Sequence, residues 1–135
     1  MFTSLDTPRH GLRLQIVSIF ANITFMPWRI IYYNERVKSA IDILPAGVRA
    51  DFARLLQLLE EFGADLRLPH SRAMGSGLFE LRPKGREGIA RVFYCMQMGQ
   101  AIVILHSFIK KTQETPKHEL DIATRRMKEV NHEQR

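Results

Sequence analysis

The pattern of hydrophobic and polar positions divides most of the chain into strands and helices. Segment 28–33, WRIIYY, is rich in aromatic and β-branched side chains and predicts a first strand. Three later apolar segments, Leu78–Arg82, Ile89–Gln97 and Ala101–Phe108, predict three further strands. Because short connections join these three, the second a tight turn around Gly99, we expect an antiparallel meander.

Three other segments have the 3.6-residue period of amphipathic helices. The first begins after Asn34, which can cap it, and ends before Pro45. The second follows Pro45 and ends at Gly63, a residue suited to a helix C-terminus. Pro116 opens the third helix, and the preceding Thr115 is its predicted N-cap.

Two parts of the chain lie outside these elements. Residues 64–77, ADLRLPHSRAMGSG, predict a loop, and His70 within it carries no specific signal. Residues 1–25 contain a moderately apolar stretch that is too short and too polar to span a membrane. It also lacks a convincing signal-peptide cleavage site. We therefore expect an N-terminal extension at 1–25, a single domain at 26–135 and no membrane partner.

The positive charge is concentrated in the C-terminal part of the chain. The formal net charge is +6, and between Arg82 and Lys128 ten Lys and Arg residues stand against four Asp and Glu. A localised basic surface is typical of proteins that bind a polyanion, most often nucleic acid. A solvated face or an acidic protein partner is the alternative. The single cysteine, Cys95, allows no intrachain disulfide and fits a cytoplasmic protein.

Strand alternation places several charged side chains on one face of the predicted sheet. Glu80 and Arg82 share a face of their strand. If the following turn centres just before Gly99, Arg91 stands directly opposite His106. The opposite face is then apolar and packs against helices through Val92, Tyr94, Val103 and Leu105.

Such a basic face suits RNA cleavage by the neighbouring 2′-hydroxyl. This reaction needs a base for the hydroxyl proton, an acid for the leaving 5′-oxygen, and cations for the charge that builds on phosphorus. The residues expected to provide these groups are Arg91, His106, Lys110 and Glu80. We expect no metal and no cofactor, because the histidines are scattered and neither H-E-x-x-H nor paired C-x-x-C occurs.

Four segments, GLFELR, RVFYC, ILHSFIKKTQETP and ELDIATRRMKE, resemble the RelE-type toxin superfamily, and most closely its phage-derived, HigB-like branch. The resemblance covers roughly residues 27–130. It implies an α+β fold in which two N-terminal helices and a C-terminal helix pack on a twisted antiparallel β-sheet. It also implies a type II toxin that cleaves messenger RNA on the ribosome and is neutralised by a cognate helix-turn-helix antitoxin.

The resemblance also extends to individual residues. Arg82 resembles the basic residue that ends the first meander strand, and Arg91 resembles the arginine that opens the next. Lys110 and Lys111 resemble the basic pair that follows the last strand. The residues expected to bind RNA are Arg82, Lys84, Arg86 and Lys111. Two alternatives stay open on the same fold: a ParE-like inhibitor of DNA gyrase, and a phage-derived binding module without toxicity.

Overall fold

The structure is a computed structural model that describes residues 28–133. Its helices are α2 (Glu35–Asp42), α3 (Ala46–Phe62), which is followed by a short 3-10 turn (Gly63–Asp65), and α4 (Lys117–Glu133). Its strands are β1 (Arg29–Tyr32), β2 (Ser71–Gly75), β3 (Leu78–Leu81), β4 (Lys84–Gly85), β5 (Gly88–Gln97) and β6 (Ala101–Ile109). The predicted extension, residues 1–25, lies outside the described residues, so the predicted domain division stays a prediction.

The described strands form one six-stranded sheet in the order β1-β6-β5-β3-β2, and the two-residue β4 pairs with β5 beside this path. The pairs β3–β5 and β5–β6 are antiparallel, as the predicted meander requires, and β2 pairs antiparallel with β3 at the edge of the sheet. Strand β1 pairs with β6 in parallel. The α+β prediction is confirmed, but the sheet is mixed rather than wholly antiparallel.

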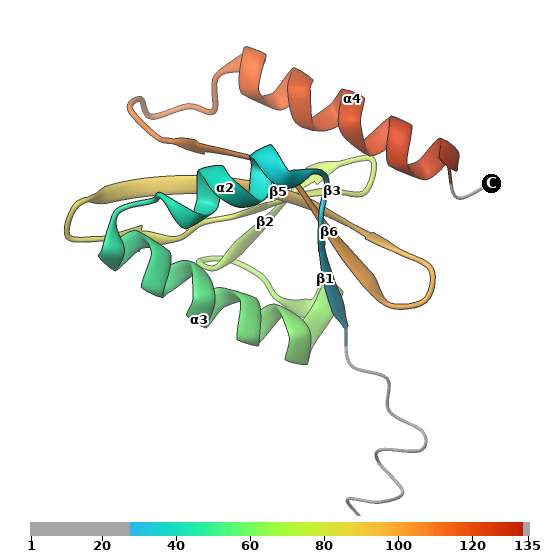
Figure 1. The fold of residues 1–135 in the computed structure, drawn as a ribbon, viewed down its shortest axis with the longest axis horizontal. Helices are drawn as coiled ribbons and strands as arrows, with labels where there is room; N and C mark the ends of the chain where they lie inside the picture. Colours follow the sequence, from blue (N-terminus) through green and yellow to red (C-terminus); the bar gives the residue numbers. More distant parts are fainter. Residues whose placement is uncertain (1–27, 134–135) are drawn as a thin grey trace, which may run out of the picture.

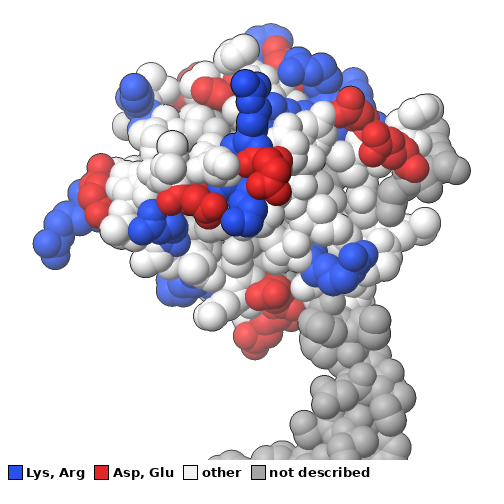
Figure 2. Space-filling model, in the orientation of Figure 1, with Lys and Arg blue, Asp and Glu red and all other residues white. Residues whose placement is uncertain are grey.

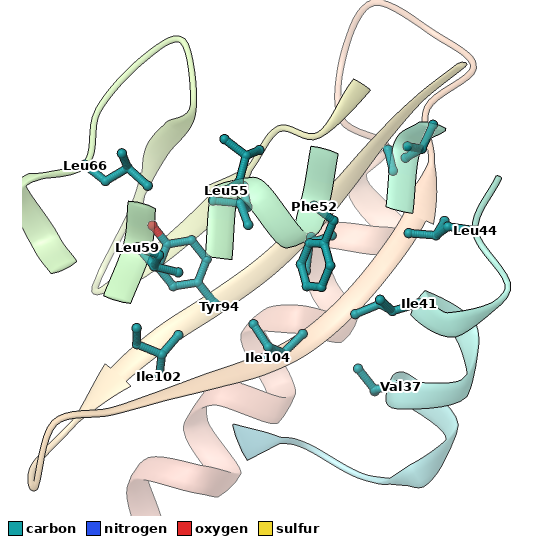
Figure 3. Packing of buried hydrophobic residues seen from close by; sticks show 14 residues of the cluster. Val37, Ile41, Leu44, Phe52, Leu55, Leu59, Leu66, Tyr94, Ile102 and Ile104 are labelled. Atoms are coloured by element: carbon teal, nitrogen blue, oxygen red, sulfur yellow. The ribbon is translucent and has the colours of Figure 1, made fainter. Parts of the chain in front are cut away.

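Helices cover both faces of the sheet. Figure 1 shows α4 on one side and α3 on the other. The larger hydrophobic core lies between the sheet and the pair α2 and α3, and the smaller one lies beneath α4. Figure 3 shows the larger core, in which Val37, Ile41, Leu44, Phe52, Leu55 and Leu59 from the helical segment face the strand residues Tyr94, Ile102 and Ile104.

The three helices form where their sequence periodicity predicts them. Asn34 caps α2, since its side-chain oxygen accepts a 2.9 Å hydrogen bond from the backbone N–H of Val37. Helix α3 ends at Gly63, whose φ of +55° suits glycine. A Cβ at Gly63 would lie 2.9 Å from the indole nitrogen of Trp28, so close packing also favours glycine there. None of the described helices is long and apolar enough to cross a membrane.

The predicted loop at residues 64–77 is partly wrong, because Ser71–Gly75 forms the edge strand β2. Only Ser71 of this strand is buried, so no apolar alternation announces it. The strand exists because its backbone pairs with β3, an interaction between two chain segments rather than a local preference.

The predicted register between β5 and β6 is also wrong. Gln97 pairs with Ala101, so the connecting loop is one residue longer than expected. Gly99 and Gln100 both have positive φ in this loop, +78° and +58°. The longer loop shifts the pairing by one residue, and a β-bulge that leaves Leu105 unpaired shifts it by one more.

As a result, Arg91 does not stand opposite His106. Phe93 pairs with His106, and Arg91 pairs with Phe108. Because each one-residue shift reverses the face, the two shifts cancel beyond the bulge. Arg91 and His106 therefore share one face of the sheet, as predicted, but they are two residues out of line.

Between the turn and the bulge only one shift applies, and the faces are reversed. Val103 and Leu105 pack with Phe93 in the core beneath α4. The prediction placed them with Val92 and Tyr94, which in fact belong to the core beneath α2 and α3. A single extra loop residue is enough to produce this exchange.

Candidate nucleic-acid interface

Glu80 in β3 is a fully buried carboxylate, with 0% of its surface exposed. One oxygen, Oε1, accepts a 3.0 Å hydrogen bond from Nη1 of Arg82 and lies 3.6 Å from Nε of Arg91. The other, Oε2, accepts a 2.7 Å hydrogen bond from the hydroxyl of Thr115. A buried charge is stable only when it is paired, and these partners pair it. Glu80 therefore orients two arginines.

Arg91 at the start of β5 is almost as buried, with 4% of its surface exposed. Its Nη1 donates to the carbonyl of Ala90 at 2.9 Å, and among the described residues its Nε has no hydrogen-bond partner. Burial lowers the pKa of Arg91, the positive charges of Arg82 and Arg72 lower it further, and Glu80 opposes these effects. Around Arg91, the positive charges of the arginines outnumber the single negative charge of Glu80.

Lys110 adds a third cation at the end of β6. Its backbone N–H donates to the carbonyl of Ile89 at 2.8 Å, which positions the residue beside the start of β5. Desolvation lowers the pKa of the Lys110 amine, and the charges of Arg91 and Arg82 lower it further. Three cations thus act on one another around a single carboxylate. We call Arg82, Arg91, Lys110 and Glu80 the basic cluster.

A pocket of about 350 Å³ adjoins the basic cluster. It is lined by Asp51, Arg54, Leu55, Pro69, His70, Arg82, Lys84, Ile89 and Arg91. The carboxylate of Asp51 is already engaged, because it accepts from Nε of Arg54 at 2.9 Å and from the backbone N–H of Lys84 at 2.8 Å. The imidazole of His70 has no hydrogen-bond partner among the described residues. The pocket therefore combines fixed positive charge with one free imidazole.

His106 lies apart from this cluster. Its Nε2 is 2.6 Å from Oε1 of Glu119 in α4, and its ring stacks with those of Phe93 and Phe108. Glu80 and His106 pair with Phe93 from opposite sides, so their backbones are two strand spacings, roughly 10 Å, apart. A different pocket, of about 170 Å³, is lined by Arg36, Val37, Ala40, His106, Ser107 and Arg126. The predicted catalytic role of His106 stays a prediction.

The structure sorts the predicted RNA-binding residues into three places. Arg82 belongs to the basic cluster, and Lys84 lines its pocket. Arg86 is exposed on the turn between β4 and β5. Lys111 is exposed beside a further pocket near the start of α4. Figure 2 shows one face of the molecule, on which basic and acidic side chains are interspersed rather than separated.

The sequence did not predict that His70 and Thr115 lie beside the basic cluster. The carbonyl of His70 accepts a 3.0 Å hydrogen bond from the N–H of Arg82, and this contact depends on the unpredicted strand β2. The prediction that Thr115 caps α4 is wrong, because α4 begins at Lys117, and the Thr115 hydroxyl donates to Glu80. The first hydrogen bonds of α4 run to the carbonyl of Pro116 from the backbone N–H groups of Glu119 and Leu120. No sequence signal we know would have linked residues so distant along the chain.

The described residues contain no group of three His, Cys, Asp or Glu side chains that could hold a metal ion. The polar side-chain groups of the basic cluster and its pocket include guanidinium, ammonium, imidazole and carboxylate. Together these can bind an anion and move a proton.

The fold places the protein among the RelE-like α+β proteins. The chain belongs to the family described as phage derived protein Gp49-like (DUF891), whose model matches residues 39–128. This is a phage-derived, toxin-like family within the RelE/HigB-like toxin superfamily. No curated protein matches the chain.

Proposed function

We propose that this protein is the toxin of a type II toxin–antitoxin system, close to the HigB-like branch, and that it cleaves messenger RNA on the ribosome. The cleavage proceeds by attack of the 2′-hydroxyl on the adjacent phosphorus and uses no metal. The observation that carries the proposal is the basic cluster, in which two arginines lie against one buried carboxylate beside a pocket and Lys110 is held next to the start of β5.

In this function the cluster stabilises the charge that develops on the phosphate. Arg82 and Arg91 present planar guanidinium groups that can contact two phosphate oxygens. Glu80 holds both arginines before the substrate arrives, so little reorganisation is needed in the transition state. Lys110 supplies the third charge, at the end of a four-carbon side chain.

The surrounding basic residues bind the RNA backbone on either side of the cleavage point. Lys84 does so from the pocket wall, Arg86 from the adjoining turn and Lys111 from the end of β6. The proposed setting is the bacterial cytoplasm, where ribosomes translate the message. The proposed neutralising partner is a helix-turn-helix antitoxin.

The test uses the full chain with ribosomes that carry a defined messenger RNA, together with mapping of transcript ends after induction in cells. Lys110→Ala removes a cluster cation that has no side-chain hydrogen-bond partner among the described residues, so the fold should persist. We expect cleavage to slow by about 10²-fold. Lys128→Ala removes an exposed lysine from α4 and serves as the matched control, with cleavage unchanged.

The competing function is inhibition of DNA gyrase on the same fold. The wild-type protein is therefore also assayed for inhibition of DNA supercoiling. Intact transcripts in arrested cells, combined with inhibited supercoiling, would overturn the proposal and favour the gyrase inhibitor. Intact transcripts without growth arrest would favour a binding module.

A further inference from the structure

We propose that His70 is the base that accepts the proton of the attacking 2′-hydroxyl. This inference rests on the proposed function, because it names a catalytic residue for that reaction. No sequence motif marks His70 as a catalytic residue. Proton transfer would then take place in the pocket beside the basic cluster and not near His106.

The position of His70 beside the basic cluster suits this role. Ser71 pairs with Leu81, and the carbonyl of the preceding His70 accepts a 3.0 Å hydrogen bond from the N–H of Arg82. His70 and Arg82 are therefore cross-strand neighbours at the end of β2 and β3, where Cβ atoms stand about 5 Å apart. His70, Arg82 and Arg91 also line the same pocket of about 350 Å³. A phosphate bound by these arginines would place its ribose within reach of the imidazole.

The imidazole of His70 is also available to accept a proton. His70 is half-buried, and its backbone N–H is bonded to the carbonyl of Arg67, so the residue is held in place. Its imidazole makes no hydrogen bond to any residue in the described part of the chain. The two carboxylates near the cluster are engaged: Asp51 by Arg54 and Lys84, and Glu80 by its own partners.

His106, the other candidate for the base, is less suited to this role. Nε2 of His106 is already 2.6 Å from the carboxylate of Glu119, and its ring is stacked against Phe93 and Phe108. Its pocket does not include Arg82 or Arg91. A proton acceptor there would be separated from the groups that stabilise the phosphate.

The step needs no reactant other than solvent water. The 2′-oxygen forms a bond to phosphorus as its proton passes to a ring nitrogen of His70. The bond between phosphorus and the 5′-oxygen breaks, and the departing oxygen takes a proton from water. The products are a 2′,3′-cyclic phosphate and a 5′-hydroxyl, and the imidazolium then returns its proton to solvent.

The experiment measures single-turnover cleavage by full-length protein on ribosomes carrying a defined message. His70→Gln and His70→Ala should each slow cleavage by about 10²–10⁴-fold. Added imidazole should restore part of the rate of His70→Ala, because the shortened side chain leaves room for it. Both variants should still bind ribosomes whose message has a 2′-deoxynucleotide at the cleavage position. His118→Gln, at an exposed histidine of α4, is the matched control and should cleave at the wild-type rate.

The outcomes separate this inference from the function on which it rests. Failure of the wild-type protein to cleave any message would remove the proposed function, and this inference with it. Cleavage by wild type and by His70→Gln at the same rate would overturn the role of His70 alone. A slow His70→Ala variant that binds normally but gains nothing from imidazole would also contradict it. If the alanine variant does not fold, His70→Gly is used for the imidazole measurement.

Discussion

The hydroxyl of Thr115 donates a 2.7 Å hydrogen bond to the carboxylate of Glu80, thirty-five residues earlier in the chain. The other oxygen of that carboxylate accepts from Arg82 at 3.0 Å. The segment that leads into α4 is thereby tied to the residue that orients the arginines. Docking of α4 and organisation of the basic cluster are consequently coupled through one buried side chain.

Glu80→Gln should destabilise the protein strongly. The amide keeps the size of the side chain but leaves the buried Arg91 without its negative partner. We expect the free energy of unfolding to fall by about 3–5 kcal/mol. Urea unfolding followed by the fluorescence of Trp28, the single tryptophan, measures this. Glu114→Gln, an exposed glutamate between β6 and α4, is the control, and equal stability of the two variants would contradict the role assigned to Glu80.

The contact between His106 and Glu119 should contribute measurably to stability. Their side chains are 17% and 26% exposed, so solvent screens them only in part. A double-mutant cycle with His106→Gln and Glu119→Gln should give a coupling free energy of about 1 kcal/mol. The exposed pair Lys117 and Asp121 provides a reference cycle and should give clearly less. Equal coupling in the two cycles would show that burial adds nothing at His106.

Cys95 should be chemically inert while the protein is folded. It is 2% exposed, and burial raises the pKa of its thiol to about 11. The reactive thiolate is therefore scarce in the native state at mildly alkaline pH. A coloured disulfide reagent should react slowly with native protein and rapidly after addition of guanidinium chloride. Because this is the single cysteine, the absorbance reports Cys95 alone, and rapid reaction of the native protein would contradict the assigned burial.

RNA binding should weaken at a lower pH than the pKa of an unperturbed lysine would predict. The pKa of Lys110 is lowered from 10.5 by desolvation and by the nearby arginines. The ammonium group therefore loses its proton, and its attraction for phosphate, below pH 10.5. Binding of a 2′-O-methyl oligonucleotide, which resists alkali, can be followed by fluorescence anisotropy across this range.

Lys110→Gln isolates the contribution of this residue to the alkaline loss. The variant should bind more weakly near neutral pH and should lose less affinity than wild type as the pH rises. Lys128→Gln, which lies outside the basic cluster, should retain the wild-type profile. Identical profiles for wild type and Lys110→Gln would exclude Lys110 from RNA binding.

The sequence by itself determined the elements that depend on neighbours close along the chain. Helix α2 follows from Asn34 as a cap, and α3 ends at Gly63, because caps and apolar periodicity act within a few turns. Strands β5 and β6 follow from continuous apolar runs. The α+β class followed from the order of these elements, and the toxin-like family followed from the resemblance of four segments to RelE-type toxins.

Only the tertiary structure decided how these elements pair. Strand β2 has no apolar alternation and forms because its backbone pairs with that of β3. One extra loop residue moved Val103 and Leu105 to the opposite face, because a one-residue change of register reverses the face of every side chain. The basic cluster arises in the same way: Arg82 contacts Glu80, His70 and the pocket only because separate segments meet there. Such contacts depend on the summed packing of the whole chain, which no local pattern encodes.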